Sequence, residues 1–179
     1  KHKTAPLFFA EPIDTKWETD LKGGYQLYNI QTALTALRQL FDKKIDNESI
    51  RQGLKHVIVN TGLQGRWQQI SEKPQIVLDV GHNKEGLSLI VKQLNNLRFQ
   101  KLHLVLGFVK GKNVSELISL FPKEASIYLA TPKIERAYPL EDLKLDLLGS
   151  ERKLMYFNSV KASFEYAKSK ATQNDLLVV

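Results

Sequence analysis

A short polar stretch follows one apolar run in the sequence, and its residue types could together bind a nucleotide. The apolar run 76–78 ends in Asp79, and Gly81, His82 and Asn83 come directly after it. A carboxylate at the tip of a strand can accept hydrogen bonds from ribose hydroxyls, and a glycine lets the backbone approach a ligand closely. Two other interpretations remain open, because Asp79 could cap the following helix and His82 with Asn83 could form a local turn.

Two later segments, residues 107–113 and 131–136, also carry polar side chains directly after predicted strands. Residues 107–113 read Gly-Phe-Val-Lys-Gly-Lys-Asn, with the glycine and lysine pattern of a phosphate-binding loop. The segment is one residue too short for such a loop and has Asn where the magnesium-binding hydroxyl belongs. It therefore predicts a flexible loop between a strand and a helix.

Composition fits a globular protein and excludes several kinds of chemistry. Of the 179 residues, 42% are hydrophobic, and no apolar run approaches the ~20 residues of a membrane helix. The absence of cysteine excludes disulfides and thiolate catalysis and agrees with a cytoplasmic location. The net charge of +7 favours phosphorylated or carboxylated ligands over nucleic acid, because the lysines are scattered. The four histidines lack the spacing of a zinc site, so we expect no metal ligands.

The sequence pattern changes within residues 57–65, which read as a connection with two glycines. Before this connection, apolar residues at helical spacing predict one helix over Tyr25–Phe41 and a second over Asn47–Lys55, with Asn47 as its cap. Residues 6–10 could form a short strand. We expect the boundary between two parts of the chain to lie in the connection.

After the connection, strands and helices alternate along the chain. Two short strands joined by Ser-Glu-Lys-Pro predict a hairpin, and Asn113 and Ser159 are expected helix caps. The expected strands are 67–70, 75–80, 102–106, 126–130, 153–157 and 176–179, and the expected helices are 87–97, 114–121, 140–148 and 159–171. This alternation predicts an α/β fold with a Rossmann-like, mostly parallel sheet, an N-terminal β-hairpin strand and helices on both faces. Ligands bind beyond the carboxyl ends of such strands, where the polar stretches lie.

Two motifs give the chain a resemblance to a known enzyme family. Residues 65–94, GRWQQISEKPQIVLDVGHNKEGLSLIVKQL, resemble the start of the C-terminal domain of folylpolyglutamate synthase/dihydrofolate synthase, a branch of the Mur ligase superfamily. In that family, Gly-Arg precedes an apolar strand that ends in Asp-x-x-His-Asn. Residues 21–37, LKGGYQLYNIQTALTAL, resemble the helix at the end of the family's central ATPase domain. The resemblance covers nearly the whole chain.

The resemblance implies that residues 1–61 are the end of the central ATPase domain and residues 62–179 the C-terminal Rossmann-like domain, truncated at its C-terminus. The implied enzyme is a monomer that uses ATP and Mg²⁺ to phosphorylate the carboxylate of dihydropteroate or a folate. The amine of L-glutamate then attacks the acyl phosphate and releases phosphate. Because the family's P-loop lies outside this chain, we expect the chain alone to be inactive.

The resemblance also implies nucleotide contacts at four residues of this sequence. Asn29 would contact the adenine side of ATP, Arg66 its phosphates and Asp79 its ribose, with His82 as a further contact. An arginine side chain is always charged and forks onto phosphate oxygens, which suits this role. Arg66 could otherwise be a surface residue that pairs with Glu72.

One loop departs from the family pattern. Lys110-Gly111-Lys112 stands where the family often has Asp-Lys-Asp, so Lys110 and Lys112 could attract the polyanionic folate or glutamate tail, or could form a solvated basic loop. Arg136 is a further candidate for binding substrate. Two other classes remain open: a Mur ligase that acts on a peptidoglycan precursor, and a noncatalytic nucleotide-binding α/β module. We expect neither a nucleic acid nor a membrane as a partner.

Overall fold

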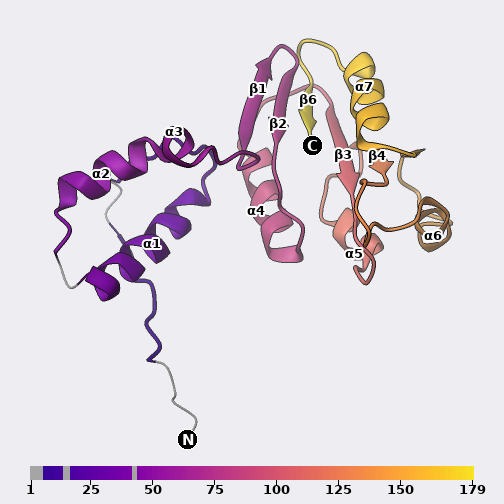
Figure 1. The fold of residues 1–179 in the computed structure, drawn as a ribbon. Helices are drawn as coiled ribbons and strands as arrows, with labels where there is room; N and C mark the ends of the chain where they lie inside the picture. Colours follow the sequence, from indigo (N-terminus) through magenta and orange to yellow (C-terminus); the bar gives the residue numbers. More distant parts are fainter. Residues whose placement is uncertain (1–5, 14–16, 42–43) are drawn as a thin grey trace, which may run out of the picture. The chain divides into compact units, whose positions relative to one another are not determined.

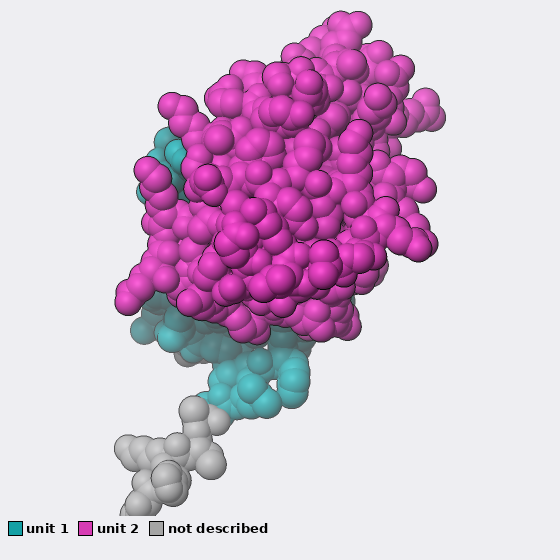
Figure 2. Space-filling view, turned by 90° about the vertical axis from the view of Figure 1, so that its right-hand side faces the viewer, with its two compact units in different colours: residues 1–66 teal, residues 67–179 magenta. Residues whose placement is uncertain are grey.

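The computed structural model describes residues 6–13, 17–41 and 44–179 of the chain. The chain forms two compact units, residues 1–66 and residues 67–179, which are coloured separately in Figure 2. The expected boundary between residues 61 and 62 lies a few residues before this division. Each unit has its own apolar core.

The first unit is helical, as its apolar spacing predicts. It contains α1 (Gln26–Phe41), α2 (Asn47–Lys55) and α3 (Val57–Thr61), which Figure 1 labels in order. Ile30 and Leu34 of α1 pack with Ile50 of α2 to form its core. This contact explains why the apolar residues recur every three or four positions in both helices.

Three predictions for the first unit are wrong. Asp46, and not Asn47, caps α2, because its carboxylate accepts the N–H of Ser49 at 2.9 Å. A short helix, α3, occupies part of the expected connection 57–65 and ends at Gly62, whose φ of 66° suits a glycine. Residues 6–10 form no strand, since the described residues of this unit offer no neighbouring strand to pair with.

The second unit contains a six-stranded sheet of the predicted type, visible in Figure 1. The strands are β1 (Gln68–Glu72), β2 (Gln75–Leu78), β3 (Leu102–Gly107), β4 (Ser126–Ala130), β5 (Leu154–Phe157) and β6 (Leu176–Val178). They lie in the order β1-β2-β6-β3-β4-β5. Only β1 pairs antiparallel, through the hairpin with β2, and the other neighbours are parallel. The last strand along the chain therefore lies in the middle of the sheet.

Helices cover both faces of this sheet, as the sequence predicts. They are α4 (Lys84–Leu94), α5 (Val114–Ser119), α6 (Leu140–Asp146) and α7 (Val160–Lys170). Val105 and Leu177 pack with Ala167 of α7 on one face. Their chain neighbours Leu104 and Leu176 point to the opposite face and are also fully buried. From β2 to β5, each new strand is added on the same side of the one before it, and the chain then returns to β6 in the middle of the sheet. Because parallel crossovers are right-handed, the return through α7 covers one face of the sheet, and α4, α5 and α6 cover the other face.

In this unit, capping side chains determine the residues at which three helices begin after the strands. Asn113 and Ser159 cap α5 and α7, as predicted, by accepting backbone N–H groups. Asn83 caps α4 by accepting the N–H of Gly86 at 2.8 Å, so this helix starts before the predicted Leu87. Asp79 is not the cap. Within the described part of the chain, no helix combines the length and apolar character needed to span a bilayer.

Candidate functional site

The predicted polar stretches meet at one cavity of the second unit. The loops after β2, β3 and β4 and the end of β6 enclose about 370 Å³, and we call this cavity the strand-end pocket. Its polar side chains are those of Asp79, His82, Lys112 and Arg136. Four residues that the sequence marked as candidates, from three different loops, therefore line one pocket.

Strand order creates this pocket. Because β6 lies between β2 and β3, the two loops that leave β2 and β3 begin two strand positions apart. Val179, which directly follows β6, forms part of the pocket wall. Ligands of open α/β sheets bind in crevices of this kind, beyond the carboxyl ends of the strands.

Asp79 ties the strand end to the backbone on both sides. Its Oδ2 accepts the N–H of Trp67 at 2.9 Å, and its Oδ1 accepts the N–H of Gly81 at 2.8 Å. A carboxylate has about four acceptor positions, so these contacts are compatible with a ribose hydroxyl as a further partner. The carboxylate therefore has a structural role that the sequence did not predict, beside its predicted role toward a nucleotide.

The turn before β1 has an unusual backbone. Gly65 and Trp67 both have positive φ angles, 69° and 50°, on either side of the exposed Arg66. A large aromatic residue seldom adopts a positive φ, and this conformation costs about 1–3 kcal/mol. The hydrogen bond from the Trp67 N–H to Asp79 stabilises the turn. Asp79, the residue directly after β2, thus helps to fix the backbone conformation next to Arg66.

Gly81 is required by close packing inside the unit. A Cβ atom on this residue would lie 2.7 Å from Cδ1 of Ile90 and 3.2 Å from Oδ1 of Asp79. The sequence predicted that this glycine admits a ligand. Gly81 lines the strand-end pocket, which is compatible with that prediction, and it also packs closely against the side chain of Ile90 on α4.

His82 lines the pocket but also makes a local contact. Its Nδ1 lies 3.2 Å from the carbonyl oxygen of Val80, and the side chain is exposed. The side chains of His82 and Asn83 therefore contact local backbone groups, as the alternative interpretation expected, but residues 79–82 form no hydrogen-bonded turn. His82 also lines the strand-end pocket. Its local backbone contact and its predicted position near a ligand are therefore compatible with each other.

The two cations of the pocket come from loops that are joined to each other. Val109 and Ala137 form an antiparallel bridge, and the N–H of Lys110 donates to the carbonyl of Arg136 at 3.0 Å. Lys112 is half-buried and Arg136 is exposed, and neither has an ion pair with the described residues. Lys110 is exposed and does not line the pocket. With two cations and one carboxylate, the pocket suits a ligand that carries negative charge.

Two predicted residues belong to the first unit. Asn29 is exposed on α1, and its Nδ2 donates to Oε1 of Gln26 at 2.8 Å. Arg66 is the last residue of that unit. Neither lines the strand-end pocket. Within the second unit, the structure therefore brings together Asp79, His82 and the two cations.

Sequence reasoning missed the apolar side of the pocket and one ion pair beside it. Leu87, Val105 and Phe108 line the pocket, and only the position of Phe108 after a predicted strand could have identified it. The ammonium of Lys84 on α4 contacts the carboxylate of Glu116 on α5, and this hydrogen bond raises the pKa of Lys84. Among the described residues, no three His, Asp or Glu side chains gather as a metal site would require.

Comparison with known proteins gives a consistent result. The sequence model of the glutamate ligase domain of Mur ligases matches residues 65–179. A probable bifunctional folylpolyglutamate synthase/dihydropteroate synthase of Haloferax volcanii is 28% identical over 172 residues, which are 95% of this chain and 20% of that protein. Dihydrofolate synthase/folylpolyglutamate synthase of Escherichia coli is 26% identical over 153 residues, 84% of this chain and 34% of that protein.

Solved structures share the fold. FolC of Escherichia coli in complex with ADP superposes with a TM-score of 0.69 and 25% identity, over 84% of this chain and 35% of that one. Folylpolyglutamate synthase of Mycobacterium tuberculosis with ADP gives a TM-score of 0.75 at 21% identity, over 91% and 38% of the two chains, and shows the fold alone. The chain spans between 20% and 38% of the length of these relatives.

Proposed function

Because the chain belongs to the Mur ligase family through its glutamate ligase domain, we propose that it is the C-terminal part of an ATP-dependent ligase. The proposed enzyme joins L-glutamate to dihydropteroate, to folates or to both. ATP phosphorylates a carboxylate of the acceptor, and the glutamate amine then displaces phosphate from this acyl phosphate to form an amide. ADP and phosphate are the other products. The names of the relatives in Haloferax volcanii and Escherichia coli, which include folylpolyglutamate synthase, support this choice of substrate.

The strand-end pocket is the observation that carries the proposal. It collects a carboxylate, an imidazole and two cations from three loops, at the sheet edge where α/β proteins bind ligands. The family match begins at residue 65 and includes all of these residues. This combination suits a ligase, because a ligase must bind several anionic groups during one reaction.

Four residues are proposed to contact ATP. Asn29 would contact the adenine side, Arg66 the phosphates and Asp79 the ribose, with His82 near the nucleotide. A positioned guanidinium stabilises the charge that develops on a phosphoryl group during transfer. The strained turn beside Arg66 supports this role, because backbone strain is often retained at functional sites.

Lys112 and Arg136 are proposed to bind the carboxylates of the substrate. Both line the strand-end pocket and have no acidic partner among the described residues. A glutamate or a polyglutamate tail would supply the missing negative charge. Lys110 lies on the same loop but outside the pocket, so we assign it at most a long-range attraction for such a tail.

Mg²⁺ is proposed to accompany ATP and to be held mainly outside this chain. One related structure contains Mn, AMPPNP and L-glutamate, which supports a divalent metal in the family. The strand-end pocket has one carboxylate and two cations, so its own side chains do not fit a divalent cation. The metal would neutralise phosphate charge, while the residues of this chain bind the nucleotide and the substrate. We also propose a monomeric enzyme without nucleic-acid or membrane partners, and the scattered lysines support the absence of a nucleic-acid partner.

The test is glutamate addition by the full-length parent protein, supplied with ATP and either dihydropteroate or a folate. We expect ADP release that depends on glutamate and on one or both pteridine substrates. In Lys112→Met and Arg136→Met, the Michaelis constant for a carboxylate substrate should rise about tenfold to a hundredfold, because each change removes a charge-assisted hydrogen bond. The 179-residue chain alone should show no turnover.

Lys110→Met is the matched control, since it removes a lysine from the same loop but not from the pocket. It should change the Michaelis constant little. Turnover with a peptidoglycan precursor in place of the pteridines would contradict the proposed substrate class. Absence of ADP release with any of these acceptors would contradict the proposed activity.

A further inference from the structure

The second unit has a cavity at the other ends of its strands. Its lining includes Lys101 just before β3, His103 in β3, Lys153 just before β5 and Lys170 at the end of α7. It encloses about 460 Å³, comparable with the strand-end pocket at about 370 Å³. We call this cavity the basic pocket. It lies at the amino ends of β3, β4 and β5, so it shares no lining residue with the strand-end pocket.

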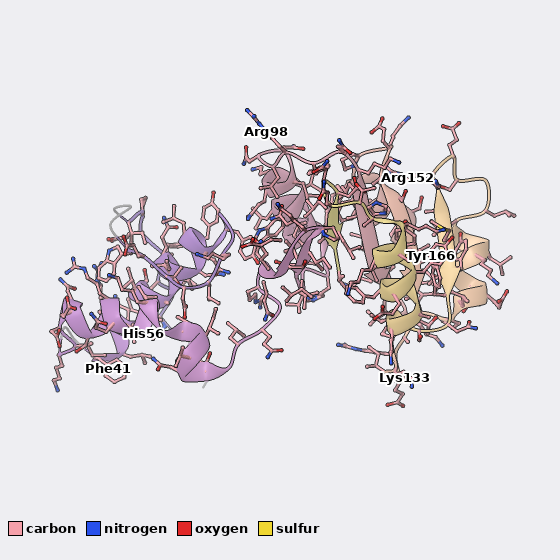
Figure 3. All side chains as sticks on the ribbon, turned by 90° about the horizontal axis from the view of Figure 1, so that it is seen from above. Phe41, His56, Arg98, Lys133, Arg152 and Tyr166 are labelled. Carbon is pink, nitrogen blue, oxygen red and sulfur yellow. The ribbon has the colours of Figure 1, made fainter. Side chains whose placement is uncertain are left out.

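The basic pocket has more positive than negative charge. Lys101, Lys153 and Lys170 line it, and none of these lysines forms an ion pair with the described residues. Glu124 is the only acidic residue among its described lining residues. The ammonium of Lys170 lies 5.2 Å from the ring centroid of Tyr166, a contact that restricts where this cation can point. Figure 3 labels Tyr166, which projects from α7.

A buried polar pair is part of the same pocket. The side chains of His103 and Tyr128 are almost fully buried, and Nδ1 of His103 lies 2.8 Å from the Tyr128 hydroxyl. The Nε2 atom of His103 is 3.5 Å from a carboxylate oxygen of Asp175 but has no well-aligned hydrogen bond. Burying polar groups without full hydrogen bonding costs free energy, and apolar residues could fill these strand positions.

We propose that the basic pocket binds the phosphate group of a small phosphorylated molecule. Lysine binds phosphate as a point charge, and three separate ammonium groups can surround a tetrahedral anion. None of the described lining residues is an arginine. Met155 and Tyr166 provide an apolar wall for the organic part of the ligand. The buried His103–Tyr128 pair gives this end of the pocket polar groups that an apolar lining would lack.

This inference does not depend on the proposed ligase function. The residues of the basic pocket have no part in the roles assigned above, and the pocket would bind its ligand whatever reaction the parent enzyme performs.

The test is a titration of the whole 179-residue chain with inorganic phosphate, followed by amide resonances in two-dimensional NMR at constant ionic strength. We expect saturable shifts at Ser126 and Met155, which line the basic pocket. Lys153→Met should weaken this binding about two- to fivefold, as expected for one partly exposed charge pair. Lys161→Met is the matched control, because this exposed lysine of α7 lies outside the pocket, and it should leave the binding unchanged.

Glutarate, a dicarboxylate, separates a phosphate site from a general anion site. Weaker binding of glutarate than of phosphate at Ser126 and Met155 would support the proposal. Equal binding of the two anions would overturn it, as would equal weakening by Lys153→Met and Lys161→Met. An absence of saturable shifts at these residues would also overturn it. Shifts at Gly81 or His82 would report the strand-end pocket and serve as an internal comparison.

Discussion

Replacement of Asp79 tests whether this carboxylate organises the strand end. In the structure, its two oxygens accept the N–H groups of Trp67 and Gly81, at 2.9 and 2.8 Å. Asp79→Ala removes both acceptors, whereas Asp79→Asn keeps one oxygen and turns an NH₂ group toward the other donor. We therefore expect the free energy of unfolding to decrease from wild type to Asp79→Asn and further to Asp79→Ala.

The size of the effect follows from the burial of the two donors. A buried donor that loses its partner costs about 1–3 kcal/mol. Trp67 is only 5% exposed, so its N–H should bear most of this cost, while Gly81 is half-buried and can partly regain water. We expect a loss of about 2–4 kcal/mol for Asp79→Ala and about 1–2 kcal/mol for Asp79→Asn.

The two tryptophans make a specific assay possible. Trp17 lies in the first unit and Trp67 in the second. In a Trp17→Phe background, tryptophan fluorescence during urea unfolding reports on the second unit alone. Asp79→Ala should shift the midpoint to lower urea with little change in slope, because it removes hydrogen bonds without changing the surface exposed on unfolding.

A loss below about 0.5 kcal/mol, the usual effect of a neutral surface substitution, would refute the structural role of Asp79. The ribose role is tested separately in the full-length protein by comparing ATP with 2′-deoxy-ATP. If Asp79 contacts the ribose, Asp79→Ala should reduce the preference for ATP. An identical preference in both proteins would show that the carboxylate only holds the backbone.

Three further outcomes are expected. Arg66→Ala in the full-length protein should lower turnover by about 10²–10³ with less effect on folate binding, and an unchanged rate would make Arg66 a surface residue. Gly81→Ala should destabilise the second unit by about 1–3 kcal/mol in urea unfolding. Ile90→Val removes the Cδ1 atom that would lie 2.7 Å from the added methyl group, so it should partly restore the stability of Gly81→Ala. No restoration would show that this contact does not cause the loss. Burial lowers the pKa of His103 from its ordinary value of 6.5 despite nearby Asp175. Since the unfolded chain then binds the proton more readily, the free energy of unfolding should fall as pH drops below 6.5, and should fall less in His103→Gln.

Local sequence signals were sufficient to predict the helices and strands of the sheet-containing unit, and several of the residues at which helices and strands begin or end. The strand 126–130 and the helix 47–55 have the predicted bounds, and Asn113 and Ser159 cap the helices that they were expected to cap. These features depend on apolar spacing and on side chains within a few residues of the backbone groups that they satisfy. Asp46 was missed although it is equally local, because two adjacent residues could both act as the cap.

The sequence predicted which segments would contribute to the site, but not how their side chains are arranged around the pocket. The sequence identified the polar segments after β2, β3 and β4, since each follows an apolar run. It did not show that the bridge between Val109 and Ala137 joins two of these loops, or that Lys110 stays outside the pocket while Lys112 lines it. Such contacts join residues more than twenty positions apart, and no local pattern encodes them.

The sequence by itself determined the α/β class, the alternation of strands and helices and the chemical types at the strand ends, because each depends on short-range periodicity and residue type. Only the tertiary structure decided that β6 inserts between β2 and β3, which opens the strand-end pocket. It also decided that Asp79 holds Trp67 and that three distant lysines share the basic pocket. The physical reason is that strand order and side-chain packing arise from pairings between distant segments, whose free energy depends on the whole sheet.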